Sequence, residues 1–299
     1  RGCFGGCAFC TISMHQGKFV VSRSAESVLK EVQKIAEMPD FKGYLSDLGG
    51  PSANMYQMRG RDLELCVKCK RPSCVFPQVC KNMNTDHRPL LDLYRRVDAL
   101  PCVKKSFIGS GIRYDLLLHR TGNETVDKAN REYTRELITK HVSGRLKVAP
   151  EHTSDAVLAV MRKPNFSLFR EFKRIFDKIN ADEHLNQQLI PYFISSHPGC
   201  ELQDMAELAV ETKNLNFQLE QVQDFTPTPM TLATEMYHTG LNPYTLKPIF
   251  VARKQSEKLA QRHFFFWYKP ETRTQIKREL QRMGRTDLID KLFGKTKKR

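Results

Sequence analysis

The chain has 299 residues, of which 40% are hydrophobic and 27% charged, a composition that supports a buried core and excludes an intrinsically disordered protein. It contains no apolar run long enough to span a membrane, which takes about 18 residues. The formal net charge is +15, and residues 249–299 hold 15 lysines and arginines against 5 acidic residues. A basic end of this kind occurs in nucleic-acid-binding proteins and also in solvated helices.

Helices and strands alternate along most of the sequence. The first helix begins after Ser24, a good N-cap residue, and ends before Pro39. Apolar residues at helical spacing predict further helices, and short apolar runs between them predict strands. The predicted helices lie near residues 24–38, 89–100, 127–140, 168–179 and 203–214, and the predicted strands are centred near residues 45, 105, 147, 191 and 220.

This alternation is typical of a parallel βα architecture. The sequence begins inside a cysteine motif without an initiating methionine, so we expect one more strand upstream of Cys3. Six βα units predict an α/β fold, a partial open (β/α)6 TIM-like barrel. We expect this barrel to span residues 1–248, with a cysteine-rich insertion at about 55–86. Residues 249–299 are expected to form a basic helical extension that ends in a disordered tail, KTKKR.

The nine cysteines are grouped, with three at positions 3–10, four at 66–80, and Cys102 and Cys200 alone. Disulfide scaffolds are usually far shorter chains, whereas clustered thiols in a large protein favour metal binding. We therefore expect a reducing, cytoplasmic location. Cys102 and Cys200 are expected to be ordinary buried thiols.

The stretch RGCFGGCAFC places Cys3, Cys7 and Cys10 in a C-x3-C-x2-C pattern. Thiolates are the ligands of iron–sulfur clusters, and a cubane takes four of them, so three cysteines leave one iron open. The glycines between them let the backbone approach a bulky group, and the phenylalanines can shield it. The alternatives are a zinc site completed by His15, or three unrelated thiols.

A second group has the pattern C-x2-C-x4-C-x5-C, formed by Cys66, Cys69, Cys74 and Cys80. Four thiols within 15 residues can wrap one metal ion or cluster. Soft thiolate ligands select zinc or iron–sulfur, and the spacing does not separate the two. Two disulfides are the remaining alternative.

Polar residues follow the predicted strands at their carboxyl ends, which is where barrels gather ligand-binding side chains. Asp47 follows the first of these strands and precedes a glycine turn, Gly49-Gly50-Pro51. The residues at the later strand ends are Ser110, Arg113, Glu151, His152, Ser195, His197, Gln223 and Asp224.

The order Cys3, Cys7, Phe9, Cys10 resembles the signature of the radical S-adenosylmethionine superfamily. The segments VKKSFIGSGIRYD, LKVAPEHTS and QVQDFTPTPMTLATEMYHTG make the chain look like the uncharacterised YgiQ-like family over nearly its whole length. The resemblance implies a [4Fe-4S] cluster on the three cysteines, with S-adenosylmethionine bound at the open iron. It also implies an enzyme that reductively cleaves S-adenosylmethionine to a 5′-deoxyadenosyl radical, which abstracts hydrogen.

The resemblance also implies roles for single residues. The backbone of Gly49 and Gly50 would hold the methionine amino group, and Ser110, Arg113 and Glu151 would contact S-adenosylmethionine. The electron would come from an external donor of the flavodoxin or ferredoxin type. The resemblance identifies no substrate. From their places near strand ends we expect these side chains to face it: Tyr192, His197, Gln223 and Tyr237.

Two other functions compete with this interpretation. One is the same radical chemistry directed at RNA, because QDFTPTPMTLAT resembles methylthiotransferases and the end of the chain is basic. The other is a non-enzymatic module that binds zinc and nucleic acid, which fits two cysteine groups and a basic chain. The run HFFFWY (263–268) can stack on bases, but we favour a helix end that covers the open side of the barrel with these rings.

Overall fold

The structure is a computed structural model that describes residues 1–294; the predicted tail, residues 295–299, lies outside the described residues. The chain has a mixed α/β architecture that divides into two compact units. Unit 1 consists of Arg1–Gly6, Ile12–Ala149 and Ser167–Ile190. Unit 2 consists of Cys7–Thr11, Pro150–Phe166 and the chain from Pro191 onward. None of the described helices is both long and apolar enough to cross a membrane.

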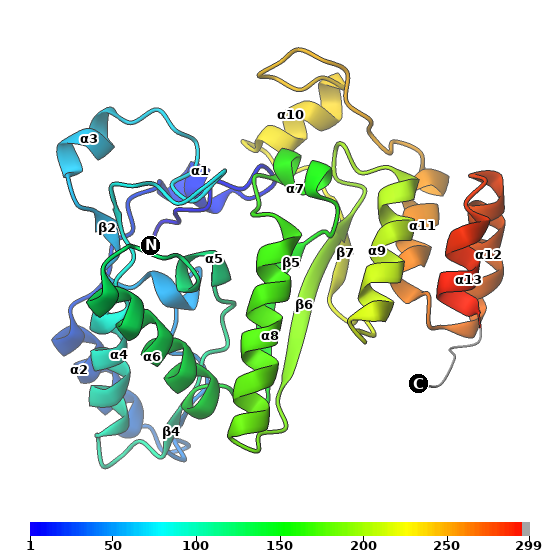
Figure 1. Ribbon diagram of the computed structural model, residues 1–299. Helices are drawn as coiled ribbons and strands as arrows, with labels where there is room; N and C mark the ends of the chain where they lie inside the picture. The colour runs from blue at the N-terminus through cyan, green and yellow to red at the C-terminus, as the bar shows by residue number, and fades with distance from the viewer. Residues whose placement is uncertain (295–299) are drawn as a thin grey trace. The chain divides into compact units, whose positions relative to one another are not determined.

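Four helices of unit 1, α2, α4, α6 and α8, lie close to the predicted ranges, whereas the short helices α1, α3 and α5 were not predicted. Helix α2 begins after Ser24, whose side chain accepts a hydrogen bond from the backbone of Ser27, as an N-cap residue should. Helices α2, α4 and α6 lie next to one another (Figure 1). The helices of this unit are α1 (Ile12–Gln16), α2 (Ala25–Ala36), α3 (Leu63–Lys68), α4 (Arg88–Asp98), α5 (Tyr114–Leu117), α6 (Glu124–Lys140) and α8 (Phe166–Asp182), with a 3-10 helix η1 (Ala53–Met55).

The five predicted strands are present, and β1 with β4 and β6 with β7 pair in parallel. Strand β1 (Tyr44–Leu45) pairs with β4 (Lys105–Ser106), and a parallel bridge joins Ile112 to Val148 of β5. The strands β5 (Arg145–Glu151), β6 (Gln188–Ser195) and β7 (Val222–Asp224) form one sheet in that order. Parallel pairing agrees with the βα alternation. The described strands form sheets of two, two and three strands, and none of these sheets closes into a barrel.

The cysteine-rich segment forms a small antiparallel structure of its own. Strand β2 (Arg59–Gly60) pairs with β3 (Met83–Asn84), and α3 lies between them along the chain. Asp62 caps α3, because its carboxylate accepts hydrogen bonds from the backbone N–H groups of Glu64 and Leu65 at 2.9 and 3.2 Å.

Unit 2 holds the end of the described chain, which is helical from α11 to α13. Phe264 and Phe265 of the HFFFWY run are fully buried, and the Trp267 Nε1–H donates to Thr212 Oγ1 on α9 at 3.2 Å. The aromatic run therefore covers apolar surface on α9. The helices of unit 2 are α7 (Asp155–Met161), α9 (Leu202–Asn214), α10 (Leu232–Thr239), α11 (Gln255–His263), α12 (Pro270–Arg282) and α13 (Thr286–Phe293), with a 3-10 helix η2 (Phe264–Phe266).

Candidate functional site

The predicted glycine turn follows β1 and is held by a carboxylate. Asp47 Oδ1 accepts from the backbone N–H groups of Gly109 and Ser110 at 2.9 and 3.1 Å, and Asp47 Oδ2 accepts from Ser110 Oγ at 2.7 Å. A Cβ atom on Gly49 would lie 2.6 Å from Asp47 Oδ1 and 2.7 Å from Ser110 Oγ. The structure therefore brings Gly49 and Ser110 together, and a side chain at Gly49 would displace the side chain of Asp47 or Ser110.

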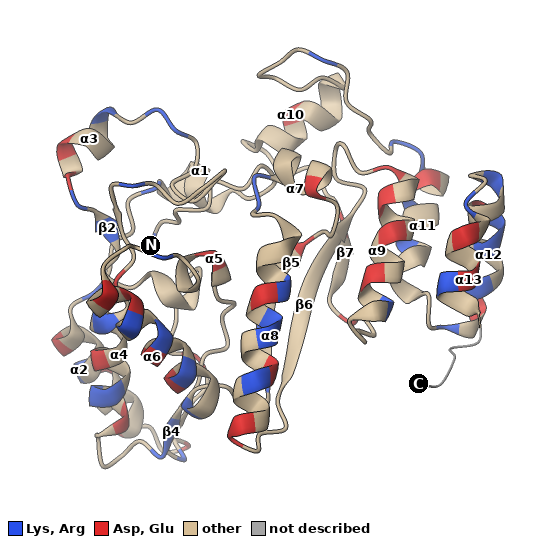
Figure 2. Ribbon diagram, viewed as in Figure 1, with Lys and Arg blue, Asp and Glu red and all other residues tan. Residues whose placement is uncertain are grey.

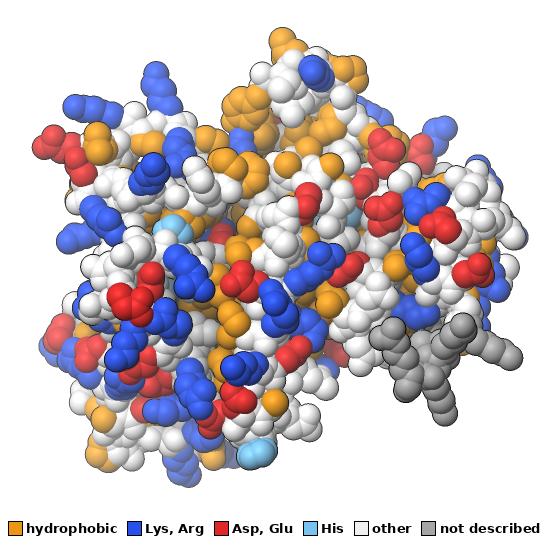
Figure 3. Space-filling model, viewed as in Figure 1, with side chains coloured by type: hydrophobic (Ala, Val, Ile, Leu, Met, Phe, Trp, Pro, Cys, Tyr) orange, Lys and Arg blue, Asp and Glu red, His pale blue; other side chains and the backbone are white. Residues whose placement is uncertain are grey.

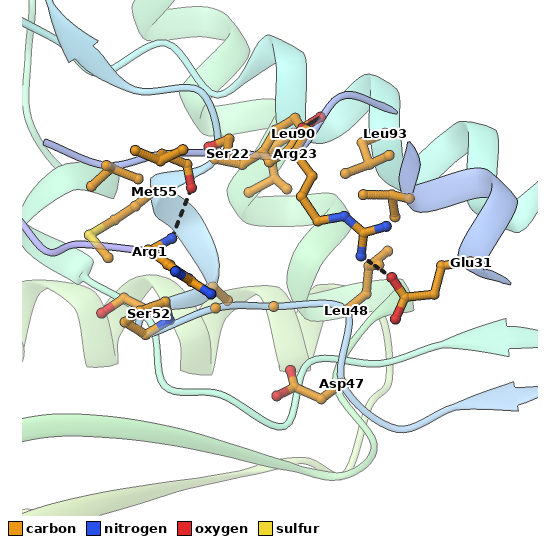
Figure 4. Close-up of a pocket in the computed structure, with 18 of the residues that line it drawn as sticks. Arg1, Ser22, Arg23, Glu31, Asp47, Leu48, Ser52, Met55, Leu90 and Leu93 are labelled. Carbon is orange, nitrogen blue, oxygen red and sulfur yellow. Dashed lines mark hydrogen bonds and ion pairs between the residues drawn. The ribbon is translucent and has the colours of Figure 1, made fainter. Parts of the chain in front are cut away.

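A cavity of about 320 Å³ borders this turn in unit 1 (Figure 4). Gly49 and Gly50 line it, together with apolar residues of α2, α4 and β1. Arg1 and Arg23 also line it, and Arg23 forms an ion pair with Glu31. The volume lies at the lower end of the range for small-molecule sites, about 300–1,000 Å³.

Arg113 is buried and its guanidinium is engaged by the chain itself. It forms an ion pair with Asp115, and both side chains are less than 10% exposed. The Asn54 side chain clamps the backbone of Arg113, accepting from its N–H at 2.7 Å and donating to its carbonyl at 2.9 Å. Asn54 belongs to η1, just after the glycine turn. Its two hydrogen bonds to Arg113 therefore connect the turn with the loop that follows β4.

Within unit 1, the start of the opening loop, residues 3–6, contacts the cysteine-rich segment, which the sequence did not indicate. The backbone N–H of Cys74 donates to Phe4 O at 2.9 Å, and a Cβ atom on Gly6 would lie 2.1 Å from Pro72 O. Phe4 belongs to an apolar cluster with Met55, Met58, Val75, Met83 and Leu116, against which Cys3, Cys74 and Cys80 also pack. Gly6 thus permits a close contact between the opening loop and the cysteine-rich segment.

The donor chemistry of both groups fits a thiophilic metal. No disulfide joins any of the nine cysteines in the described part of the chain, so the structure does not contain the disulfide alternative. Burial raises the pKa of Cys74, the Lys18 ammonium opposes this shift, and the neighbouring thiols of the same segment raise the pKa further. In the described part of the chain, no group of three or more His, Cys, Asp or Glu side chains is arranged around a single ion. The thiols would therefore have to gather to bind a metal.

The carboxyl ends of β5 and β6 lie in unit 2 and carry residues with left-handed backbone. Glu151, at the end of β5, has φ +69°, and Ser196, directly after β6, has φ +59°. Left-handed backbone costs a non-glycine residue about 1–2 kcal/mol, and such strain clusters at functional sites. Glu151 lies 3.8 Å from the Lys163 ammonium. At the end of β7, Asp224 accepts from Ser195 Oγ at 2.5 Å.

His197 follows β6 and is completely buried. Its Nδ1 lies 2.8 Å from Pro198 O, whereas its Nε2 has no hydrogen-bond partner. A carbonyl can only accept, so Nδ1 carries the proton and Nε2 has a bare lone pair. Burial lowers the pKa of His197 to about 4, which keeps the ring neutral at pH 7. The ring makes edge contacts with Phe9 and Phe225, at centroid distances of 5.9 and 5.2 Å.

The segment after β6 is fixed from α11. Gln261 Oε1 accepts from the backbone N–H of Ser196 at 2.7 Å, and Gln261 Nε2 donates to Cys200 O at 2.7 Å. His152 Nε2 lies 3.5 Å from Cys200 Sγ. Burial lowers the pKa of His152 to about 3 and raises the pKa of the Cys200 thiol. Cys200 is thus a buried, neutral thiol, as predicted.

Among the residues predicted to face a substrate, His197 is the one with an unused polar atom. Tyr237 lies between two cations, with Lys258 and Arg253 at 5.1 and 5.6 Å from its ring centroid. Tyr192 is half-buried on β6, and Gln223 is exposed on β7. An unpartnered buried nitrogen can be recognised only from coordinates, because the sequence does not show which neighbours surround a histidine.

Sequence comparisons identify homologues of the whole chain. A protein of Bacteroides thetaiotaomicron is 69% identical over 298 residues, and one of Porphyromonas gingivalis is 67% identical over 296 residues. A protein of the archaeon Methanosarcina acetivorans is 44% identical over 289 residues. All three are named UPF0313 proteins, the family that is also called YgiQ-like.

The homologues are longer than this chain. The matched region covers 100%, 99% and 97% of the chain, but only 48%, 47% and 38% of the three relatives, so the chain spans about half of their length or less. Residues 220–297 also match a family described as a domain of unknown function, DUF3362. This match begins just before β7 and includes α11, the helix that holds Ser196 and Cys200 through Gln261.

Proposed function

We propose that the chain is the core of a radical S-adenosylmethionine enzyme with a partial, open TIM-like barrel. Cys3, Cys7 and Cys10 would hold a [4Fe-4S] cluster, and the carboxyl ends of the strands would hold S-adenosylmethionine. The observation that carries the proposal is the glycine turn after β1. A Cβ atom on Gly49 would crowd the side chains of Asp47 and Ser110, in a chain that opens with three cysteines in eight residues.

Each residue around the site has a role that its contacts support. Asp47 fixes the backbone of Gly109 and Ser110 beside the glycine turn, and the exposed backbone of Gly49 and Gly50 would be available to a ligand. In unit 2, Glu151 would supply a carboxylate, and His197 would supply a neutral acceptor at its buried Nε2. When bound, the cluster supplies the electron that cleaves the sulfonium of S-adenosylmethionine. Cys66, Cys69, Cys74 and Cys80 would bind a second metal, either zinc or an iron–sulfur cluster.

Counting iron and sulfide in the full-length protein after anaerobic reconstitution tests the proposal. The wild type should hold about four irons per cluster, and a Cys3/Cys7/Cys10 triple alanine variant should lose one complete cluster. A Cys66/Cys69/Cys74/Cys80 quadruple alanine variant should lose a second cluster or a zinc ion. Cys102→Ala, a matched loss of a free thiol outside both groups, should retain all metal.

The reaction is tested separately by incubation with dithionite and S-adenosylmethionine. The wild type should release 5′-deoxyadenosine, and the triple variant should release none. A protein that contains zinc and no iron, and that releases no 5′-deoxyadenosine, would contradict the proposal and favour the zinc-binding module.

A further inference from the structure

The sulfur of Cys66 lies against the hairpin formed by β2 and β3. A Cβ atom on Gly60 would lie 2.2 Å from Cys66 Sγ and 3.0 Å from Asn82 Nδ2, so a side chain at position 60 would displace both groups. Gly60 pairs with Met83 in the ladder between the two strands, and Asn82 is the next residue along. Because Gly60 has no side chain, the Cys66 thiol can approach the backbone of the hairpin.

The Asn82 side chain holds this sulfur in a defined orientation. Its Nδ2 group donates to Cys66 Sγ at 3.3 Å and to Asp62 O at 2.7 Å, while its Oδ1 accepts from the Asp62 N–H at 2.9 Å. A reversed amide would place its N–H groups against the Asp62 N–H and its oxygen against the Asp62 carbonyl. The backbone of Asp62 therefore fixes an N–H donor toward the sulfur. Asp62 also caps α3, the helix that carries Cys66.

Backbone hydrogen bonds join the four cysteines of this segment in two pairs. The Cys69 N–H donates to Cys66 O at 3.2 Å, and the Cys80 N–H donates to Cys74 O at 2.8 Å. Residues 59–81 contain six lysines and arginines against two acidic residues. Figure 2 shows the basic residues along the loops on both sides of α3, and Figure 3 shows basic side chains projecting in the same part of the view. Positive surroundings favour the thiolate form that binds metals.

We propose that Asn82 is a positioning residue of the second metal centre, where its amide N–H orients the Cys66 sulfur as a ligand. The inference rests on the proposed function, in which Cys66, Cys69, Cys74 and Cys80 bind zinc or an iron–sulfur cluster. Each thiol that binds releases its proton to the solvent, and a metal–sulfur bond replaces the S–H bond. Groups that hydrogen-bond a metal ligand fix its direction, and their loss usually costs about 10–100-fold in metal affinity.

Zinc affinity tests the role of Asn82 in the full-length protein, measured by competition with a chromophoric chelator after metal removal. The triple alanine variant of the opening cysteines serves as the background, so that the second group alone supplies clustered thiols. We expect Asn82→Ala and Gly60→Ala each to bind Zn²⁺ at least tenfold more weakly than this background. Asn84→Ala is the matched control on β3, because the Asn84 side chain accepts from the Asp86 N–H at 3.1 Å. It should stay within twofold.

A spectroscopic measurement separates a positioning role from a structural one. Co²⁺ bound by thiolates has a sulfur-to-metal charge-transfer band whose intensity follows the number of thiolate ligands. At saturating Co²⁺, Asn82→Ala should weaken this band as Cys66→Ala does, and Asn84→Ala should leave it unchanged. Unfolding midpoints of the metal-free variants serve as the folding control.

The possible outcomes distinguish this inference from the proposed function. Equal Zn²⁺ affinities of Asn82→Ala and Asn84→Ala would overturn the inference and leave the metal site standing. An unchanged Co²⁺ band in Asn82→Ala, with a loss of affinity that only follows its loss of stability, would also overturn it. If the background protein bound Zn²⁺ no better after the four cysteines of the segment were replaced by alanine as well as before, the second metal site itself would be contradicted.

Discussion

Gly49 and Gly50 are adjacent, but the space around them differs. A Cβ atom on Gly49 would meet two side-chain oxygens at 2.6 and 2.7 Å, whereas the nearest atom to a Cβ on Gly50 lies at 3.8 Å. We expect Gly49→Ala to lower the free energy of unfolding by about 1–3 kcal/mol, the usual cost of overpacking. Gly50→Ala should change it by less than about 1 kcal/mol.

Urea denaturation of the two variants measures this difference. We also expect Gly49→Ala, but not Gly50→Ala, to weaken the binding of S-adenosylhomocysteine, because the displaced Asp47 and Ser110 side chains move the turn. If Gly49→Ala and Gly50→Ala were equally stable, the turn would accommodate a side chain at Gly49, and the prediction would be wrong.

His197 makes a second prediction at the residue scale, through its unpartnered Nε2. In His197→Gln the side-chain amide extends to the position of Nε2 and retains an acceptor, whereas in His197→Asn it reaches only the position of Nδ1. If Nε2 accepts a hydrogen bond from the bound nucleotide, Asn should weaken S-adenosylhomocysteine binding about three- to tenfold, since a neutral hydrogen bond contributes about 0.5–1.5 kcal/mol. Gln should bind nearly as the wild type does.

Isothermal titration with S-adenosylhomocysteine separates the two variants, and their unfolding midpoints serve as the control. Equal affinity for Asn, Gln and wild type would remove His197 from the nucleotide site. If both variants lost affinity for S-adenosylhomocysteine in proportion to their loss of stability, the role of His197 would be purely structural.

At the scale of elements, local sequence patterns predicted the positions of the main helices but did not predict the contacts between elements. Ser24 and Pro39 bound a helix that the structure places at Ala25–Ala36, because caps and breakers act on their own neighbourhood. Strand β1 is shorter than its apolar run suggests, since its limits depend on pairing with β4. The contact of Phe4 with Cys74 joins segments about 70 residues apart, and no sequence pattern reports such a pairing.

The same limit applies to the site. The positions of Asp47, Gly49 and Ser110 followed from the rule that parallel strands present their carboxyl ends together, and the structure brings these three residues into contact. Two other contacts depend on side-chain geometry: the ion pair between Arg113 and Asp115, and the hydrogen bond between Gln261 and the backbone of Ser196. Neither residue type nor spacing predicts them.

Helix α11 stabilises the strained end of β6 through one side chain. Gln261 is buried and binds the backbone of both Ser196 and Cys200. In Gln261→Leu, the Ser196 N–H would lose its partner, and an unpaired buried polar group costs about 1–3 kcal/mol. We expect that loss in the free energy of unfolding, measured in urea. The control Gln255→Leu, at an exposed position of the same helix, should change stability by less than about 0.5 kcal/mol. Equal effects would contradict the role of Gln261.

At the scale of the whole molecule, buried histidines couple folding to pH in both units. His87 in unit 1 and His152 and His197 in unit 2 are completely buried, and burial lowers their pKa values to about 4, 3 and 4. Between pH 6.5 and these values, the unfolded chain binds protons that the folded chain excludes. The stability that the neutral rings contribute is therefore complete above pH 6.5 and is lost as the pH falls toward 4.

Each of these histidines should contribute a slope of up to about 1.4 kcal/mol per pH unit in that window. We expect the metal-free protein to lose stability steeply between pH 6.5 and 4.5 in urea denaturation followed by circular dichroism. His87→Gln removes one such group and should flatten the pH dependence of the unit 1 transition by about that slope, even if it lowers stability at pH 7. A stability that is flat from pH 7 to 5 would mean that these rings are reached by water in the folded protein, since only exclusion from water keeps them neutral.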